Sequence, residues 1–305
     1  MNKHILFDKL TVAAASFVAG KKKFFSKSAE SLTFKELIQE IDIETPDFKG
    51  ENTYELILKS KKGNLNAAFK IEKWLGFNYP TIIYHHGNNE RPFDYGKRAK
   101  NSFFKIFVKS RDDFNANLIV VRAPYHDCSL KEYQEKMTIL ENFMMMITCS
   151  VKINEAIIKK IREKSQTPVY TCGISLGGWV TNLHRSLYNT STFYIPLLAG
   201  TFLGELFAES EYRKLTGKAA LENLENVRRL LNFNELFLKI KKQNVYPLLA
   251  EYDQFIEFRI QKESYRGIDV RIIKTGHITA LLNLEIIRKH IFAIVNKKSG
   301  KNENT

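Results

Sequence analysis

The pattern of apolar and polar residues divides most of the chain into strand-like and helix-like segments. Residues 54–58 and 67–71 alternate apolar and polar positions, which predicts an antiparallel hairpin with one face exposed to solvent. The later strand-like runs are apolar at almost every position, which is typical of strands covered on both faces of a parallel sheet. They are residues 81–84, 118–121, 168–172, 193–198, 245–250 and 270–273.

Helix-like segments separate these runs, with apolar residues at helical spacing in residues 97–109, 130–164, 176–188 and 278–296. Alternation of strand and helix predicts a doubly wound α/β fold with right-handed crossovers. Residues 201–243 break the alternation, because they hold helical patterns and no strand candidate. We interpret them as a helical cap over the ends of neighbouring strands, with plain helical packing as the alternative.

The first 45 residues differ from the rest of the chain. They predict a helix and a basic linker, and we expect residues 46–300 to form the α/β domain with its cap at about residues 201–243. The apolar stretch 11–20 precedes three lysines, whereas a signal peptide has its positive charge first and a cleaner apolar core. We therefore expect a helix that packs on the domain or touches a membrane surface.

The composition is that of a folded protein with a basic surface. Hydrophobic residues make up 44% of 305 residues, which is enough for a sizeable core. The formal net charge of +14 favours anionic partners such as an acidic membrane surface, to which we expect at most a weak contact. No aromatic residues interleave the basic clusters, so we expect no nucleic-acid partner. Three cysteines without a C-x-x-C pair fit a reducing, cytoplasmic compartment, with a location peripheral to the membrane as the alternative.

The segment Gly173-Ile174-Ser175-Leu176-Gly177 is a G-x-S-x-G motif between a predicted strand and a predicted helix. In that setting the serine occupies a sharp turn, and glycines leave room for the strained backbone. The N-terminus of the following helix favours developing negative charge. We predict Ser175 as a nucleophile; the alternative is a glycine-rich turn with an incidental serine.

A serine nucleophile needs a histidine base and a carboxylate that orients the histidine. Of the histidines that follow Ser175, we favour His277, because it comes just after a predicted strand and just before a helix. Glu251 and Asp253 both follow the strand predicted at residues 245–250. We favour Asp253 as the acid, because the acid must reach over toward the histidine, and Glu251 is the competitor.

The sequence His85-His86-Gly87-Asn88 follows an early predicted strand. The oxyanion that forms during attack on a carbonyl needs two hydrogen-bond donors, for which we predict the N–H groups of Asn88 and Leu176. Gly87 lets the backbone approach. Two neighbouring histidines also suggest a metal site, but adjacent residues at a strand end point to opposite sides and no spaced carboxylate–histidine set lies nearby. We therefore expect no metal and no cofactor.

On these residues the chain resembles the α/β-hydrolase superfamily of esterase- and lipase-like serine hydrolases. His86-Gly87, the Ser175 motif, Asp253 and His277 each follow a strand candidate, in the order that the superfamily shows. The resemblance implies an eight-stranded, mostly parallel sheet with one antiparallel strand near the start. It also implies Ser175 as nucleophile, Asp253 as orienting acid and His277 as base.

The resemblance covers about residues 50–297 and leaves the subgroup open. Residues 122–129 depart from the Asp-x-Pro-Gly-x-Gly loop that many members carry. We expect hydrolysis of a carboxylic ester, in a small-molecule or lipid-like substrate, through an acyl-enzyme. The alternatives are a thioesterase, an amidase or peptidase of the same fold, and a non-catalytic member that binds an anionic membrane surface or a partner. Apolar cap residues suggest an acyl pocket, with ordinary core as the alternative: Phe202, Leu203, Leu206, Phe207, Leu230, Leu231, Phe233, Leu236 and Phe237.

Overall fold

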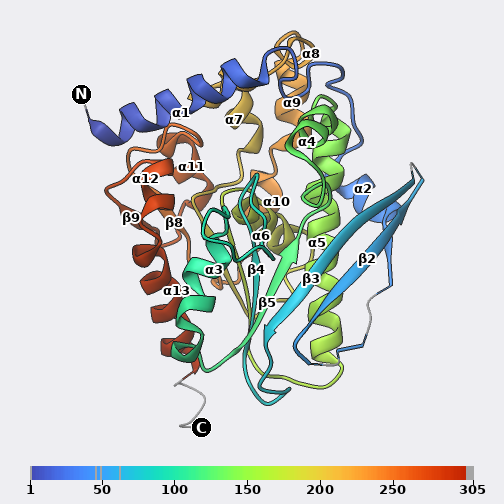
Figure 1. The fold of residues 1–305 in the computed structure, drawn as a ribbon, viewed down its shortest axis with the longest axis vertical. Helices are drawn as coiled ribbons and strands as arrows, with labels where there is room; N and C mark the ends of the chain where they lie inside the picture. Colours follow the sequence, from blue (N-terminus) through green and yellow to red (C-terminus); the bar gives the residue numbers. More distant parts are fainter. Residues whose placement is uncertain (1, 45–46, 49, 62, 300–305) are drawn as a thin grey trace.

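A twisted sheet runs through the middle of the molecule in the computed structural model (Figure 1). The structure describes residues 2–44, 47–48, 50–61 and 63–299. The predicted boundary at residues 45 and 46, and the predicted domain end at residue 300, lie outside them. The strands are β1 (Asp42–Ile43), β2 (Asn52–Ser60), β3 (Gly63–Lys73), β4 (Thr81–His85), β5 (Asn117–Arg122), β6 (Val169–Ile174), β7 (Phe193–Leu197), β8 (Leu248–Ala250) and β9 (Arg271–Ile273).

The strand order is β1-β2-β3-β5-β4-β6-β7-β8-β9. Strands β1, β2 and β3 are antiparallel to their neighbours, and all pairs from β5 to β9 are parallel. The predicted doubly wound, mostly parallel sheet is confirmed. The described residues hold nine strands where eight were predicted, because the short β1 pairs with the outer edge of β2.

Helices cover both faces of the sheet, and the strands feed two buried cores. Alternate residues of a strand point to opposite faces. Ile83 of β4 belongs to the core that α5 and α6 cover, whereas Ile82 and Tyr84 belong to the core that α3 and α13 cover. All residues of β4 are buried, which explains its continuous apolar sequence. The helices outside the cap are α1 (Lys3–Ala19), α2 (Phe34–Glu40), α3 (Ser102–Ile106), η1 (Val108–Asp113), α4 (Leu130–Met137), α5 (Leu140–Arg162), α6 (Leu176–Leu187), α11 (Phe258–Lys262), η3 (Glu263–Tyr265), α12 (His277–Leu282) and α13 (Leu284–Ser299).

The helical stretch predicted at residues 130–164 is two helices, α4 and α5. The break lies at Ile139, whose backbone is extended. A segment from the start of the chain pairs there, since Ser28 forms a β-bridge with Ile139 and the N–H of Phe25 donates to the carbonyl of Met137. The periodic pattern of residues 130–164 carries no sign of this partner, so one helix was predicted where the structure has two.

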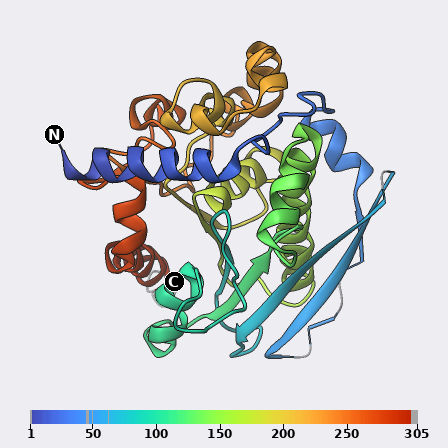
Figure 2. The same cartoon turned by 45° about the horizontal axis from the view of Figure 1, so that its top comes forward.

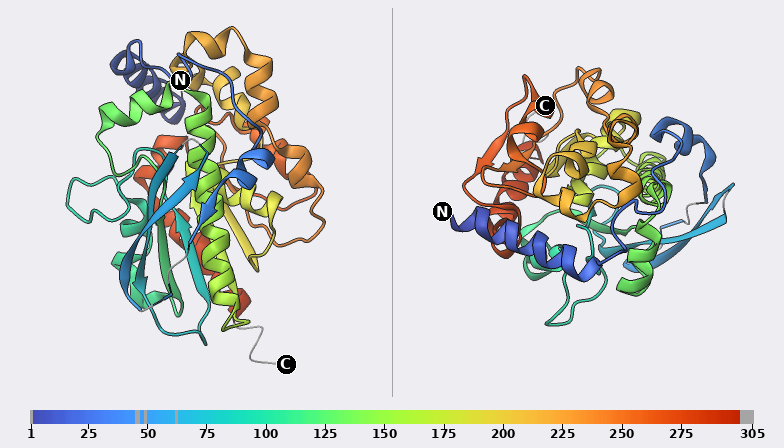
Figure 3. Two further views of the ribbon diagram at one scale, coloured as in Figure 1. Left: turned by 90° about the vertical axis from the view of Figure 1, so that its right-hand side faces the viewer. Right: turned by 90° about the horizontal axis from the view of Figure 1, so that it is seen from above.

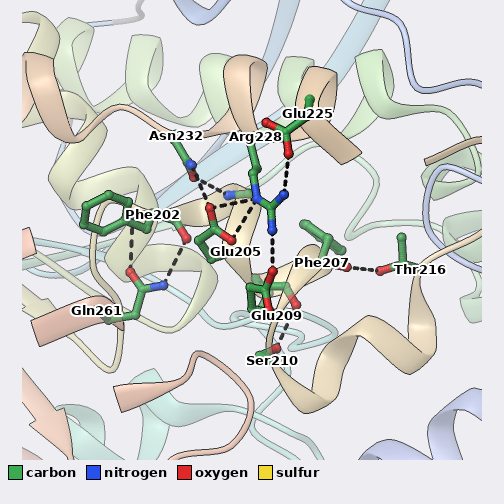
Figure 4. Close-up of polar contacts among 12 residues, drawn as sticks. Phe202, Glu205, Phe207, Glu209, Ser210, Thr216, Glu225, Arg228, Asn232 and Gln261 are labelled. Carbon is green, nitrogen blue, oxygen red and sulfur yellow. Dashed lines mark hydrogen bonds and ion pairs between the residues drawn. The ribbon is translucent and has the colours of Figure 1, made fainter. Parts of the chain in front are cut away.

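Residues 201–243, the predicted cap, are helical; α7, α8 and α9 lie at the top of the molecule in Figure 1, whereas α10 lies lower and packs against α6. Arg228 hydrogen-bonds to Glu205 at 3.1 Å and also to Glu209, which links two cap helices (Figure 4). Gln261 of α11 donates from Nε2 to the carbonyl of Phe202 at 3.0 Å, which ties the cap to the α/β domain. The cap elements are α7 (Leu203–Ala208), η2 (Glu211–Leu215), α8 (Lys218–Leu221), α9 (Leu224–Leu231) and α10 (Asn234–Leu238).

The N-terminal helix α1 lies across the same end of the molecule as the cap (Figures 2 and 3). It packs against η2 and α12, and the hydroxyl of Ser16 donates to the carbonyl of Lys214 in η2. Within the described residues, no helix combines the length and the apolar composition that a membrane span needs. The start of the chain therefore packs against elements formed by its last third.

Candidate active site

Ser175 occupies the turn between β6 and α6. Its φ is +53°, a region that residues with a side chain rarely adopt, and its N–H donates to the carbonyl of Leu197 at 2.8 Å. This strained turn lifts the hydroxyl above the end of β6, as the motif predicts.

Two glycines of the motif are required by close approach of the backbone. A Cβ on Gly177 would lie 2.1 Å from the carbonyl oxygen of His85, because the start of α6 packs directly on the end of β4. A Cβ on Gly173 would lie 2.2 Å from the carbonyl oxygen of Gly177. A side chain at Gly177 would therefore push the start of α6 away from β4, and a side chain at Gly173 would push the start of α6 away from the end of β6.

His277 joins Ser175 to Asp253. Its Nε2 lies 3.1 Å from the Ser175 hydroxyl, and its Nδ1 lies 2.7 Å from Oδ2 of Asp253. The other carboxylate oxygen of Asp253 accepts from the N–H groups of Phe255 and Ile256 at 2.9 and 3.0 Å. Asp253 is fully buried, so its charge acts on the histidine with little screening.

The side chain that reaches the histidine is Asp253 and not the competitor Glu251. The backbone of Glu251 still pairs with the sheet, since its N–H donates to the carbonyl of Ile273 at 2.9 Å. Asp253 lies two residues further, in the turn that leads over to His277. Of the two predicted candidates, the structure brings Asp253 together with His277 and Ser175.

The surroundings of His277 favour its protonated form. Burial acts to lower the pKa of His277, but the charge of Asp253, the hydrogen bond to it and the charge of Asp8 outweigh burial and raise the pKa. The ring of Phe255 stacks on the imidazole, with centroids 4.8 Å apart and planes 11° apart. An imidazole held in this way can accept the proton of the Ser175 hydroxyl and keep it as an imidazolium.

The two predicted oxyanion donors line one small cavity with Ser175 and His277. Leu176 is the first residue of α6, so its N–H has no acceptor within the helix. Asn88 follows β4, and Oδ1 of its side chain accepts from the hydroxyl of Tyr133 in α4. The loop is thus fixed by its neighbour α4, with Asn88 in the wall of the cavity that Ser175 also lines.

His86 and Gly87 form the support of this loop. The Nε2 atom of His86 accepts from the N–H of Ala123 at 3.1 Å, so the neutral ring carries its proton on Nδ1 and donates to the carbonyl of Gly87 at 2.7 Å. Burial and the nearby His126 lower the pKa of His86, which keeps it neutral. His86 therefore joins the loop after β4 to the loop after β5.

The expectation that His85 and His86 point to opposite sides is wrong. Their rings stack with centroids 4.9 Å apart and planes 18° apart. His86 lies one residue beyond the end of β4, where the alternation of a strand no longer holds. Among the described residues, no group of three or more histidine, cysteine, aspartate or glutamate side chains could hold a metal ion.

Space for a substrate lies on two sides of Ser175. The small cavity has about 40 Å³ and is mostly apolar, with Leu203, Leu206 and Phe207 of the cap in its wall. A groove of about 440 Å³ runs from the same serine past Gly87 and α12 to the surface. Other apolar cap residues named from the sequence are core or partly buried: Phe202, Leu230, Leu231, Phe233, Leu236 and Phe237.

Sequence reasoning missed several residues at the site, among them Asp8 and Phe255, which contact His277. Asp8 accepts a hydrogen bond from the backbone N–H of His277 although it lies 269 positions earlier in the chain. Its one sequence signal is that it is the sole acidic residue among the first 29. Phe255 comes two residues after Asp253, and no pattern of the sequence distinguishes it from a core residue.

No family model and no curated protein matches the chain. Solved structures do match it. The acylaminoacyl peptidase of Pyrococcus horikoshii is 14% identical over 86% of this chain, with a TM-score of 0.55. An acetyl xylan esterase from a Thermoanaerobacterium species is 13% identical over 88%, with a TM-score of 0.53, and one from a Paenibacillus species is 13% identical over 85%, with a TM-score of 0.54.

The chain spans less than half of the peptidase, 44% of its length, but 96% and 92% of the two esterases. At these identities the match is one of fold, and the neighbours share the architecture of a mostly parallel sheet with helices on both faces. The strand order and the turn between β6 and α6 agree with it. This chain therefore has the α/β-hydrolase fold.

Proposed function

We propose that the protein is a serine hydrolase that cleaves carboxylic esters with a short acyl group. The observation that carries the proposal is the chain of hydrogen bonds from the Ser175 hydroxyl to His277 at 3.1 Å and from His277 to Asp253 at 2.7 Å. This arrangement is the one that activates a serine hydroxyl at neutral pH. It recurs on unrelated folds, so its geometry is a stronger argument than the fold alone.

The reaction follows from the geometry in two halves. Ser175 Oγ attacks the ester carbonyl carbon while His277 Nε2 takes the hydroxyl proton, and the N–H groups of Leu176 and Asn88 stabilise the oxyanion. His277 returns the proton to the alkoxide oxygen, so the alcohol leaves and an acyl-serine remains. A water molecule then gives a proton to His277 and attacks the acyl carbon, and His277 passes that proton to Ser175 Oγ as the acid leaves.

The two spaces beside Ser175 support separate binding sites for the acyl part and the alcohol part of the substrate. The acyl group stays attached during the intermediate, so we assign it to the smaller, apolar cavity, and we assign the alcohol, which must leave, to the larger groove. This cavity has about 40 Å³ against about 440 Å³ for the groove, so it favours a small acyl group. Acetyl to butyryl groups match this size.

Esters are favoured over amides because an alkoxide leaves more readily than an amine, and a thioester is the nearest competitor. Purified protein should be tested with p-nitrophenyl esters from acetate to octanoate, with a matched thioester and anilide. We expect kcat/KM to be highest for acetate to butyrate and at least about tenfold lower for octanoate. A preference for the thioester or anilide would overturn the choice of substrate while leaving the hydrolase in place.

The controls for this panel are Ser175→Ala and Ser186→Ala. Ser186 lies on the same helix, α6, and its hydroxyl donates within the helix to the carbonyl of Asn182. We expect loss of turnover for Ser175→Ala alone. Equal turnover of wild type and Ser175→Ala would contradict the proposal. Complete absence of turnover in wild type would favour a non-catalytic protein that binds a partner.

A further inference from the structure

The carboxylate of Asp8 is buried beside the candidate active site and takes no part in the reaction proposed above. Asp8 lies on α1 and has no exposed surface, although the rest of that helix is mostly exposed. Burial of a carboxylate is costly unless hydrogen bonds compensate for the lost water. Its partners therefore show what the residue does.

In the described residues, the hydrogen bonds to the Asp8 carboxylate come from three backbone N–H groups, one in the turn after Asp253 and two in the first two residues of α12. Oδ2 accepts from Gln254 at 3.0 Å and from His277 at 2.8 Å, and Oδ1 accepts from Ile278 at 3.0 Å. Gln254 directly follows the acid Asp253. One carboxylate thus bridges the residue after the acid and the base itself.

The fit around this carboxylate is tight. A Cβ on Gly276 would lie 2.9 Å from Oδ2 of Asp8 and 3.0 Å from Oδ1, so a side chain there would displace it. A second contact from α1 strengthens the junction, since Nδ1 of His4 lies 2.8 Å from the hydroxyl of Thr279. The ring of His4 also stacks on Tyr252, with centroids 5.8 Å apart. Helix α1 therefore holds the turn around Asp253 and the start of α12 at fixed positions.

We propose that Asp8 is a positioning residue that fixes the turn after Asp253 and the start of α12 relative to each other and so keeps His277 aligned between its acid and Ser175. The inference rests on the proposed function, because it assumes that His277 is the base. A shift of the imidazole by about 1 Å can cost about a hundredfold in rate, so the loss of this bridge should act on kcat.

The test compares Asp8→Ala, Asp8→Asn and the control Val12→Ala, by kcat and KM for p-nitrophenyl acetate and by thermal unfolding. Val12 is the other buried residue of α1, and it makes no polar contact with either loop in the described residues. We expect kcat of Asp8→Ala to fall about a hundredfold with KM within about threefold. Val12→Ala should lose stability but keep kcat within about twofold.

The variant Asp8→Asn tests the pH dependence of kcat/KM, which would not change if Asp8 only stabilised the fold. The amide keeps the size and one acceptor, so the protein should fold, but the negative charge is lost. Since the charge of Asp8 helps to raise the pKa of His277, the fall of kcat/KM on acidification should move to lower pH in this variant. This variant carries the test if Asp8→Ala does not fold.

Wild-type kcat and an unchanged acid limb in Asp8→Asn would overturn the positioning role. So would a loss of kcat in Val12→Ala that equals the loss in Asp8→Ala. Failure of the proposed function is a different result, in which wild-type protein itself neither turns over esters nor reacts with a fluorophosphonate.

A second, independent observation concerns the outer face of the same helix. Phe7, Leu10, Phe17 and Val18 are large apolar side chains that point to solvent, with Phe17 89% and Val18 70% exposed. Scattered exposed apolar residues are ordinary, but four of them on one helix of 17 residues form a continuous strip. Such a strip indicates a surface that binds a partner.

The charges around this strip indicate which partner. Six lysines lie among the first 29 residues, and the sole acidic residue there, Asp8, is buried. Lys9, Lys22 and Lys27 form ion pairs with Glu211 or Glu135, so the inference rests on the lysines at the two ends of the helix. Lys3 precedes the strip and Lys21 follows it, and both are exposed. Lysines that flank an exposed apolar helix face are typical of helices that lie in the headgroup region of an anionic bilayer.

The entrance of the candidate site opens beside this face. Thr11 of α1 lines the groove that starts at Ser175, together with Leu281 and Leu282 of α12. Leu282 is 74% exposed, so it extends the apolar surface toward the groove. We infer that the outer face of α1 docks on an anionic phospholipid surface and turns the groove toward it.

Sedimentation with lipid vesicles tests this inference. We expect binding to phosphatidylcholine vesicles that contain about 30% phosphatidylglycerol, no binding to pure phosphatidylcholine, and a steep loss of binding with salt. The double variant Phe17→Ser, Val18→Ser should lose binding at least about tenfold. The control Ile57→Ser removes an apolar side chain of β2 that is 59% exposed, and this variant should bind as wild type does.

Two results would contradict the inference. One is the absence of binding to anionic vesicles at low salt. The other is a dimer in light scattering that the double variant abolishes, which would assign the face to a second copy of this chain.

Discussion

At the scale of single residues, the chemistry depends on how His277 is held. Asp253 accepts from its Nδ1, Asp8 accepts from its backbone N–H, and Phe255 stacks on its ring. Each contact restricts a different motion of the imidazole. The Ser175 hydroxyl then lies within reach of Nε2 without any rearrangement.

The choice between Asp253 and Glu251 gives a prediction at this scale. Asp253→Asn keeps the shape but loses the charge that stabilises the imidazolium, so kcat for p-nitrophenyl acetate should fall about ten-thousand-fold. Glu251→Gln should change kcat by less than about twofold, because Glu251 contributes its backbone to the sheet. Larger loss in Glu251→Gln than in Asp253→Asn would assign the acid to Glu251.

The site could be predicted from the sequence where its residues follow strands. Ser175, Asp253 and His277 come just after three separate apolar runs, and parallel strands bring their carboxyl ends to one edge of the sheet. Asp8 could not be predicted in this way. It acts from a helix 246 positions before Gln254, and no local pattern links the two.

At the scale of elements, the site lies between rigid strands and a cross-linked cap. The loops after β4, β6, β8 and β9 carry the reacting groups, while α7 and η2 close the small cavity. The ion pairs of Arg228 with Glu205 and Glu209 hold α7 against α9. Side chains of the cap therefore limit the size of the small cavity.

A cap variant should widen the range of acyl groups. Leu206 of α7 is 9% exposed and lines the cavity, so Leu206→Ala should raise the ratio of kcat/KM for octanoate over butyrate about tenfold. Leu230→Ala is the matched control, because Leu230 is a buried leucine of α9 outside the cavity wall. An equal change of the ratio in both variants would show that the cap does not set acyl length.

Elements were predicted best where periodicity alone decides them. Strand β8 is shorter than its apolar run, residues 245–250, because Pro247 has no N–H to donate and separates Leu248–Ala250 from the isolated bridge that Val245 forms with Tyr194. Likewise residues 130–164 are broken by a partner segment distant in the chain. In both cases hydrogen bonding overrides an apolar pattern.

At the scale of the whole molecule, buried histidines make stability depend on pH. Burial lowers the pKa of His85 to about 3 and those of His126 and His290 to about 4, from an ordinary 6.5. The unfolded chain therefore binds protons below pH 6.5 that the folded chain refuses, so stability falls on acidification. The raised pKa of His277 instead favours the folded state on acidification, but the buried histidines with a lowered pKa outnumber it.

Urea unfolding at pH 7.5 and pH 5.0 checks this expectation. His85 and His126 should each cost about 2 kcal/mol of unfolding free energy at pH 5.0. The pKa of these histidines is near 6.5 in the unfolded chain and near 4 or below in the folded chain. The loss of unfolding free energy therefore falls between these two pH values. An unfolding free energy that is equal or higher at pH 5.0 would show that these histidines are not held neutral.

The most direct test of the central claim is reaction with a fluorophosphonate, followed by mass spectrometry of the modified peptide. An activated serine hydroxyl displaces fluoride and forms a stable phosphonyl ester, whereas an ordinary serine does not react. We predict one adduct, on Ser175, at neutral pH, with none in Ser175→Ala and full labelling of Ser186→Ala. Wild-type protein that stays unlabelled beside a reactive control esterase, or an adduct on another residue, would contradict the account.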